Sequence, residues 1–173
     1  MIFPKTMIEN CAAIKDYSRP YLQNPYLDVE GKQLIATDGH KLVFVPVVPE
    51  DGDVSGYVTG KALAAARKLA KRTEPSIRCN GALELTDGTV LPRPENQAFP
   101  VDGVKRVIPD TKGCKIVSFN AQLLLDIAKA IGEGKDTIAT VVILHLPEDN
   151  TRAIKVTKSG TEAFGVLMPV RME

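Results

Sequence analysis

The strongest constraint on the fold is a faint internal repeat. Three times along its 173 residues the chain passes through an extended apolar piece, a helix-length segment and several strand-like runs, in that order. The repeat predicts three similar half-units, at residues 1–50, 51–109 and 110–173. Because each half-unit combines one helix with several antiparallel strands, the predicted fold class is α+β.

Capping residues place two of the three helices. Thr59 precedes a helical pattern over residues 61–72, and Asn120 precedes another over residues 121–131, which Gly132 ends. Thr and Asn side chains accept hydrogen bonds from the free N–H groups of a first helical turn, and Gly tolerates the backbone conformation that closes a last turn. We therefore expect matching helices in the second and third half-units.

The two helices also agree in their apolar positions. Aligning the two N-caps pairs Leu63 with Leu124 and Ala66 with Ile127. In the first half-unit, a proline near the first helical position favours a third helix, over residues 5–17. The repeat is weak in identity but constant in the order of its elements.

Strand-like apolar runs follow each helix. Asp-Gly pairs at residues 38–39 and 87–88 lie between such runs and are typical of hairpin turns. Proline-rich stretches at residues 46–49 and 92–109 separate the half-units. We therefore predict a complete domain of two half-units over residues 1–109 and a third half-unit over residues 110–173. The predicted strands span residues 33–37, 42–45, 76–79, 82–85, 89–91, 140–146, 153–157 and 163–168.

Charge is unevenly distributed along the chain. The whole chain carries 22 basic and 21 acidic side chains, a net charge of +1, which excludes a uniformly basic nucleic-acid binder of the histone type. Residues 53–109 hold nine basic and six acidic side chains, or +3, whereas residues 110–173 hold eight of each, or zero. On the predicted second helix the apolar residues share one face, and five cations share the other: Lys61, Arg67, Lys68, Lys71 and Arg72.

This basic helix face has two interpretations. Cations without acidic neighbours would contact DNA phosphates without reading bases. Short basic faces are also common on helices that meet only solvent. The chain lacks Trp and contains 5% aromatic residues, so we do not expect it to stack on single-stranded bases.

Residues with catalytic potential are few. Asp38 and His40 flank a turn, but side chains two positions apart are poor acid–base partners unless the turn folds them together. His145 lies in an apolar run, which is typical of a packed or edge histidine. The three cysteines are far apart, which argues against a disulfide framework or a metal site. We expect a protein that is not an enzyme and that uses no cofactor or metal.

The sequence contains no sign of a membrane or secretory segment. No apolar run approaches the roughly 20 residues of a membrane-spanning helix. Residues 1–15 lack the basic start and apolar stretch of a signal peptide. The expected location is cytoplasmic, without a membrane partner.

The most distinctive motif is ATDGHKL, at residues 36–42. It resembles the ATDGHRL signature of the bacterial DNA polymerase III β subunit, the sliding clamp. Residues 99–109 resemble the FPDYRRVLP segment of this family, residues 117–131 resemble the strand–helix opening of the second half of its last domain, and residues 166–172 resemble its C-terminal VVMPMRL. The motifs occur in the family's order and span most of the chain.

The chain departs from this family in several respects. A β subunit has three domains of two half-units each, whereas three half-units amount to one and a half domains. The chain resembles the middle domain joined directly to the last half of the final domain. Lys41 replaces the usual arginine, two extra residues lie within residues 99–109, and Glu173 follows the usual end.

The resemblance implies a groove that captures short peptides of polymerases and repair proteins. Its apolar residues, with adaptable Met packing, would hold the peptide, and His40, Arg106 and Arg171 would orient it through polar contacts. The alternative is that residues 166–168 form only a core strand and that Arg171 lies in solvent. The corresponding positions here are Thr37, Gly39, His40, Lys41, Leu42, Pro100, Arg106, Val107, Val166, Leu167, Met168, Pro169, Val170, Arg171 and Met172.

The resemblance also implies a function, that of a compact, non-enzymatic clamp-like protein. Such a protein would bind duplex DNA without sequence preference and present its groove to clamp-binding peptides. The alternative is an adaptor or decoy that does not encircle DNA and that sequesters clamp-binding partners or modulates a full-length clamp. A half-unit without a partner exposes an apolar face and a strand edge, so we expect a homo-oligomer. Two third half-units would pair about a two-fold axis, and a ring of twelve half-units would need four chains.

Overall fold

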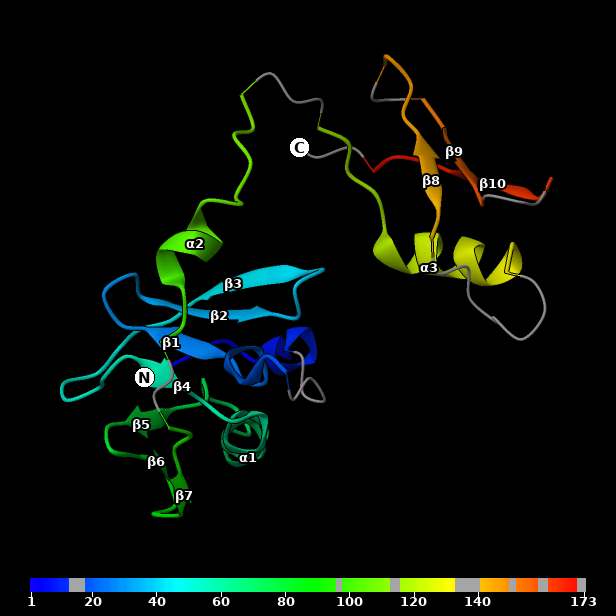
Figure 1. Cartoon of the computed structure of the whole chain (residues 1–173). Coiled ribbons are helices and arrows are strands. Elements are labelled where there is room, and N and C mark those ends of the chain that lie inside the picture. The colour runs from blue at the N-terminus through cyan, green and yellow to red at the C-terminus, as the bar shows by residue number, and fades with distance from the viewer. Residues whose placement is uncertain are drawn as a thin grey trace. The chain divides into compact units, whose positions relative to one another are not determined.

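The computed structural model describes residues 1–12, 18–95, 98–112, 116–132, 141–149, 152–158 and 162–170. The chain forms two compact units, unit 1 over residues 1–108 and unit 2 over residues 109–173 (Figure 1). The division lies one residue before the predicted border between residues 109 and 110. Small antiparallel sheets combined with short helices make the chain an α+β protein, as predicted.

A four-stranded antiparallel sheet forms the first part of unit 1. Its hairpin of β2 and β3 places Thr37 opposite Leu42, which confirms the two strands predicted on either side of the Asp-Gly turn. Strand β4 comes from the predicted second half-unit but pairs with β1 of the first. The sheet therefore joins the two half-units. Its strand order is β3 (Leu42–Pro46), β2 (Gln33–Thr37), β1 (Tyr26–Asp28) and β4 (Gly56–Tyr57).

A three-stranded sheet forms the second part of unit 1. Its order is β5-β6-β7, and each strand agrees with the prediction to within one residue at either end. Ile2 forms isolated bridges with Val48, after the first sheet, and with Ser76, before the second. The beginning of the chain therefore contacts both half-units. The strands are β5 (Ile77–Cys79), β6 (Ala82–Leu85) and β7 (Val90–Pro92).

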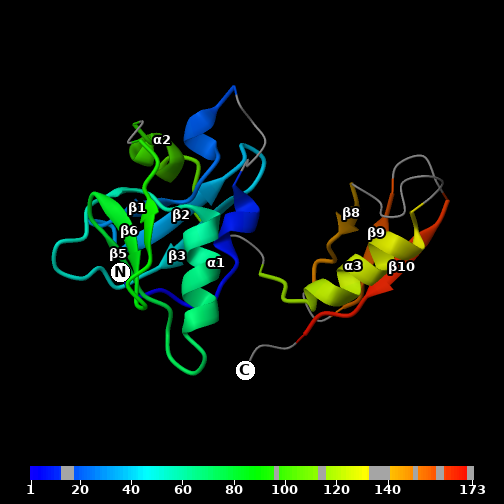
Figure 2. The same ribbon diagram turned by 90° about the horizontal axis from the view of Figure 1, so that it is seen from below.

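Helix α1, Gly60–Leu69, packs against β5 and β6 of this sheet (Figure 2). Thr59 caps its start as predicted, because Oγ1 accepts a hydrogen bond from the Ala62 N–H at 3.2 Å. The predicted end at residue 72 is wrong, because Ala70 leaves the helical conformation with a ψ of 64°. The basic residues that follow it lie in a loop.

The helix predicted over residues 5–17 is wrong in the part that the structure describes. Only the 3-10 turn η1, Ile8–Cys11, is helical there, and Ala12 after it is extended. The Thr6 N–H donates to the Pro4 carbonyl at 2.7 Å in a tight turn, which keeps the preceding residues out of helical geometry. Residues 13–17 of this prediction lie outside the described residues. A second 3-10 turn, η2 at Pro20–Leu22, precedes β1.

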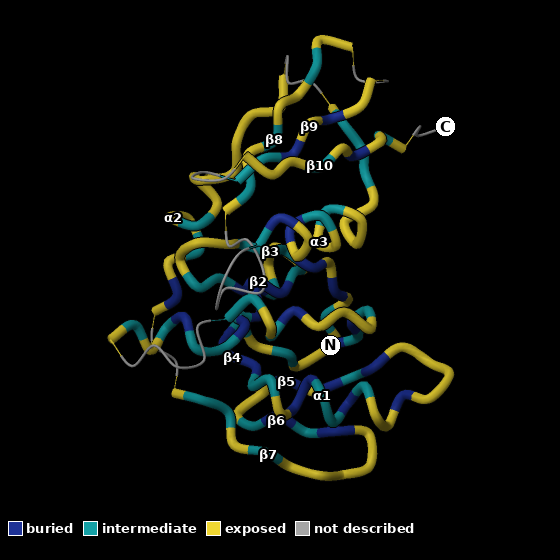
Figure 3. Tube along the Cα trace, turned by 90° about the vertical axis from the view of Figure 1, so that its right-hand side faces the viewer, coloured by how far each residue is buried: buried dark blue, intermediate teal, exposed yellow. Residues whose placement is uncertain are grey.

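The two half-units of unit 1 share one apolar core. Burial is concentrated along both sheets and the inner side of α1 (Figure 3). Removing this apolar surface from water is the main force that holds the half-units together. The core contains Met1, Phe3, Ile8, Leu27, Leu34, Ala36, Val45 and Val47 from the first half-unit and Val58, Ala62, Leu63, Ala66, Ile77, Cys79, Leu83 and Leu85 from the second.

An aromatic cluster covers the opposite face of the first sheet, where Ile35 points away from the shared core. Phe99 stacks on Tyr26 with 4.8 Å between ring centroids and meets Tyr57 edge-on at 6.3 Å. Helix α2, Val101–Lys105, follows directly. Its five residues include a glycine and are too short to show helical periodicity, so the sequence pattern did not indicate it. Phe99 anchors α2 to the sheet.

Unit 2 contains one helix and one three-stranded sheet. Helix α3, Ala121–Ala130, begins as predicted at Asn120, whose Oδ1 accepts from the Gln122 N–H at 2.9 Å. The sheet has the order β10 (Phe164–Leu167), β9 (Ile154–Thr157) and β8 (Ile143–His145). Its strands are shorter than the predicted runs, of which residue 140 lies outside the described part. The buried core is small: Ala128, Ile131, Ile154, Val156 and Leu167.

The described part of the chain contains no helix with the length and apolar character that a membrane span requires.

We predict that Phe99→Ala destabilises unit 1. Phe99 is 7% exposed, and truncating a buried Phe leaves a cavity that costs about 3–5 kcal/mol. All four tyrosines lie in residues 1–108, so tyrosine fluorescence during urea unfolding reports on unit 1. Phe99→Leu should cost less because it keeps most of the apolar volume. A loss below about 1 kcal/mol in Phe99→Ala would show that this ring does not anchor the segment.

Candidate functional site

The turn between β2 and β3 is built by its own side chains. The Asp38 carboxylate accepts hydrogen bonds from the backbone N–H groups of His40 and Lys41, both at 2.9 Å. Thr37 Oγ1 accepts from the Gly39 N–H at 3.0 Å. Gly39 has a φ of +91°, a conformation that favours glycine. The motif therefore encodes a rigid turn whose tip presents His40 to solvent.

The same geometry argues against an acid–base pair of Asp38 and His40. The carboxylate binds the main-chain N–H of His40, and these backbone hydrogen bonds lower the pKa of Asp38 below its usual range. An aspartate held in this way is a poor proton acceptor near neutral pH. We interpret Asp38 as a turn-forming residue.

A pocket of about 410 Å³ opens beside this turn. It brings together seven residues that the clamp resemblance assigns to a peptide groove, from two segments almost 60 positions apart in the sequence. Arg106 is not among the lining residues and lies exposed after α2. The seven residues are Thr37, Gly39, His40, Lys41, Leu42, Pro100 and Val107.

Five further lining residues were not identified from the sequence: Arg19, Tyr21, Leu22, Gly103 and Val104. The first three lie on or beside η2, and the other two lie on α2. A Cβ at Gly39 would lie 2.7 Å from Arg19 Nη1, but this flexible side chain can move away, so the positive φ is the reason for glycine in the turn. The sequence feature that could have indicated η2 is the pair Tyr21-Leu22 directly after a proline.

Helix α2 forms one wall of the pocket and is held by an ion pair. Lys105 Nζ lies 2.9 Å from Asp28 Oδ2, and the same carboxylate accepts from Gln33 Nε2 and the Gly31 N–H, both at 3.0 Å. Burial alone would raise the pKa of Asp28, but the hydrogen bonds from Gly31, Lys105 and Gln33 lower it overall. Phe99 and this ion pair therefore fix the two ends of the pocket wall.

The C-terminal residues of the predicted groove belong to unit 2. Val166, Met168 and Val170 are 55%, 60% and 53% exposed. Leu167 is only 1% exposed and lies in the core of unit 2, opposite Ile154. Its assignment to the groove is corrected, because side chains alternate between the two faces of a strand. Pro169 is partly buried. The remaining two groove residues, Arg171 and Met172, lie outside the described residues.

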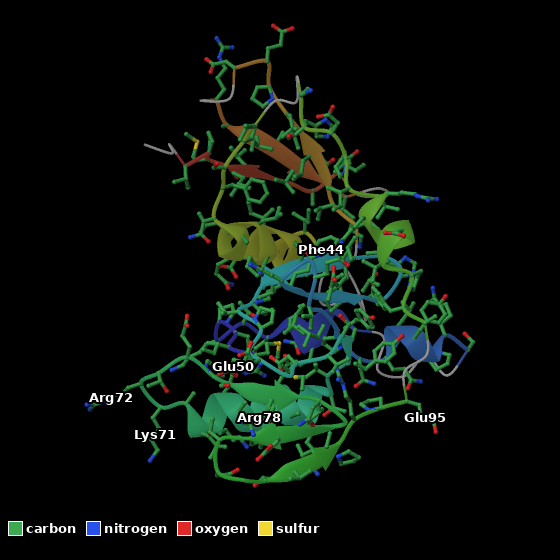
Figure 4. The ribbon with its side chains drawn as sticks, turned by 90° about the vertical axis from the view of Figure 1, so that its left-hand side faces the viewer. Phe44, Glu50, Lys71, Arg72, Arg78 and Glu95 are labelled. Carbon is green, nitrogen blue, oxygen red and sulfur yellow. The ribbon has the colours of Figure 1, made fainter. Side chains whose placement is uncertain are left out.

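Four of the five predicted DNA-binding cations are exposed: Lys61, Lys68, Lys71 and Arg72. Lys71 and Arg72 extend outward from the loop after α1 (Figure 4). Lys5 Nζ donates to the Lys71 carbonyl at 3.2 Å and adds a cation there. We call Lys5, Lys68, Lys71 and Arg72 the basic patch.

Arg67 does not belong to the basic patch. Its guanidinium forms an ion pair with the Glu9 carboxylate and donates to the Thr6 carbonyl at 2.8 Å. Its side chain is 13% exposed. The assignment of Arg67 to DNA binding is therefore corrected: this residue connects α1 to the first half-unit. Helical periodicity placed it near the polar face but could not reveal an acidic partner 58 positions away.

No known family model matches the chain, and no curated protein matches its sequence.

We predict that Asp28→Asn reduces the stability of unit 1 in a pH-dependent way. The folded-state pKa of Asp28 is lowered, so its contribution is present above the unfolded pKa of about 3.9 and is lost as pH falls through the folded value. At pH 7 the variant should lose about 1–2 kcal/mol through the weakened charged hydrogen bonds.

Urea unfolding at a series of pH values tests this. The stability gap between wild type and Asp28→Asn should shrink on acidification from pH 5 to pH 2. Asp102→Asn removes a carboxylate from the exposed side of α2 and should leave the stability nearly unchanged. A gap that stays constant with pH would show that the Asp28 charge does not hold α2.

Proposed function

We propose that the protein is a compact, non-enzymatic relative of the bacterial DNA sliding clamp. It binds duplex DNA without sequence preference and presents a peptide-binding groove to DNA polymerase or repair proteins. The observation that carries this proposal is the pocket, which combines the ATDGHKL turn with Pro100 and Val107. The resemblance assigned these two segments to one groove from sequence alone.

The lining of the pocket supports a peptide ligand with an apolar anchor. Leu22, Leu42, Val104 and Val107 supply apolar surface, and Val107 is 68% exposed. Such a concave apolar site with a few polar groups is typical of ligand recognition. Among the described residues that line the pocket, none is acidic, whereas Arg19 and Lys41 are basic and His40 carries an imidazole. A carboxylate close to the apolar anchor of the peptide would complement them.

The exposed side chains of Val166, Met168 and Val170 on unit 2 are proposed to offer further apolar surface to a peptide. Methionine adapts its shape to different ligands, which suits a protein that binds several peptides.

The basic patch supports DNA contact of the non-specific kind. Lys68 lies in the last turn of α1, where a cation also stabilises the helix dipole, so its position has a structural explanation as well. Lys61 lies in the first turn, where the dipole disfavours a cation. The dipole therefore does not explain Lys61, for which we propose a contact with phosphate.

A second candidate function is a peptide-binding adaptor or decoy that does not encircle DNA. The ion pair of Arg67 with Glu9 favours it, because it removes the central cation of the predicted DNA-binding face. The remaining cations lie near the two ends of a helix about 15 Å long. The salt dependence of DNA binding separates the two candidates.

We predict that Val107→Asp weakens peptide binding by at least about tenfold, because it places a charge on an apolar wall of the pocket. His40→Ala should cost about 1–2 kcal/mol if one hydrogen bond is lost. Removing residues 168–173 should abolish binding while unit 1 stays folded. Fluorescence anisotropy with a labelled clamp-binding peptide of a DNA polymerase measures all three.

Val48→Asp is the matched control, because Val48 is 61% exposed and does not line the pocket. It should bind the peptide like the wild type. Equal affinities for Val107→Asp and Val48→Asp would exclude the pocket as the binding site.

We predict that the double variant Lys68→Gln, Lys71→Gln weakens DNA binding equally for unrelated sequences. The slope of the logarithm of the binding constant against the logarithm of the salt concentration should also become shallower, by up to about 1.8. Each lost phosphate contact contributes about 0.9 to this slope. Lys32→Gln with Lys112→Gln removes the same charge from exposed positions outside the patch and should leave the slope unchanged. If the wild type binds duplex DNA without salt sensitivity, the adaptor function replaces the clamp-like one.

A further inference from the structure

The pocket beside the turn of β2 and β3 has a cationic end and an apolar side. The Arg19 guanidinium lies at the turn, with Nη2 3.5 Å from the Asp38 carbonyl oxygen. Lys41 Nζ donates to the Asn10 carbonyl at 2.9 Å, and His40 adds an imidazole to the same end. A ligand in the pocket can therefore contact cationic and apolar groups at once. The apolar side includes Leu22, Leu42, Pro100, Val104 and Val107.

The cationic end can accept an anion. Lys41 is 52% exposed, and its Nζ lies 3.5 Å from the Asp38 carboxylate. This carboxylate already accepts two backbone hydrogen bonds of the turn at 2.9 Å, and an exposed ion pair of this kind is weak. Lys41 can therefore pair with a second carboxylate. Among the described residues that line the pocket, none is acidic and would repel it.

The size of the pocket restricts how a ligand can bring an anion and an apolar group together. Its volume of about 410 Å³ lies near the lower end of the roughly 300–1,000 Å³ of ligand pockets. In an extended peptide, neighbouring side chains point to opposite sides, and residues two positions apart are separated by about 7 Å. An acidic side chain next to an internal apolar anchor would therefore point out of the pocket.

We propose that the pocket recognises the C-terminal end of a partner protein whose last residue is apolar. The side chain of that residue packs against Leu42, Val104 and Val107, and its α-carboxylate lies at the turn beside Lys41 and Arg19. Both groups are attached to one Cα, so a chain end brings them into the pocket together. Capture of a C-terminal carboxylate is a recurring mode of peptide recognition. Chain-end recognition rests on the proposed peptide-binding function and names the class of peptide.

Two matched probes test this proposal. One is the tetrapeptide acetyl-Gly-Ser-Ala-Leu with a free C-terminal carboxylate, which is ionised at pH 7, and the other is the same peptide as its C-terminal carboxamide. Titrations of the full chain, followed through its backbone N–H signals by NMR, measure weak dissociation constants and locate the binding site. The free acid should bind about tenfold tighter or more, because only its charged group can pair with the cations. Signals of residues 37–42 and 101–107 should shift.

Charge variants show whether the turn supplies this preference. Lys41→Gln should weaken binding of the free acid about threefold to tenfold and leave binding of the carboxamide unchanged. Arg19→Gln should act in the same direction and serves as the second variant if Lys41→Gln does not fold. Unchanged binding of the carboxamide shows that the pocket is intact. Lys112→Gln is the matched control, because it removes one positive charge from an exposed position outside the pocket.

Equal affinities of the two probes overturn the proposal, and so does a free acid that does not bind up to about 10 mM. Signal changes confined to residues outside the pocket overturn it as well. A labelled clamp-binding peptide of a DNA polymerase, titrated in parallel, tests the proposed function separately. If that peptide binds the pocket while the two probes bind alike, only chain-end recognition fails. If the free acid is preferred while the polymerase peptide does not bind, only the clamp-like function fails.

Discussion

The burial of one apolar core between two half-units is the interaction on which the rest of unit 1 depends. Strand β4 pairs with β1 across the border of the half-units, and Ile2 bridges segments on both sides of it. These backbone hydrogen bonds fix the register of the two sheets, but the driving force is the apolar surface that both remove from water. The ion pair of Arg67 with Glu9 adds a polar link at the same junction. Each half-unit of unit 1 buries its part of the shared core against the other.

The candidate pocket lies on the outer face of this arrangement. The first sheet buries Leu34 and Ala36 in the shared core and turns Ile35 to the other side, where Phe99 packs. Covering this outer face brings α2 beside the turn of residues 37–41. The pocket therefore depends on the last segment of unit 1. This segment covers the outer face of the first sheet and also supplies Pro100 and Val107 as one wall of the pocket.

Local signals in the sequence predicted local structure well. The N-caps Thr59 and Asn120 and the strands around the Asp-Gly turn are confirmed because each depends on neighbours a few residues away. The failures involve partners that are distant in sequence. Arg67 was assigned to a DNA-binding face because Glu9 could not be placed beside it.

Other features escaped prediction for lack of any periodic pattern. Helix α2 is held by Phe99 and by the Lys105–Asp28 pair rather than by its own propensity. The pocket residues on η2 were missed for the same reason. Which face of β10 carries Leu167 depends on the strand's register, and a shift of one residue would reverse it. The motifs identified seven of the twelve residues that line the pocket, and only the fold showed the other five.

The two walls of the pocket are held by separate contacts. The hydrogen bonds of Asp38 shape the turn of residues 37–41, whereas Phe99 and the Lys105–Asp28 ion pair hold α2. The pocket therefore has its shape before a ligand is bound. Because it is concave and has cationic residues around it, a peptide with an apolar anchor fills it without any change in the fold.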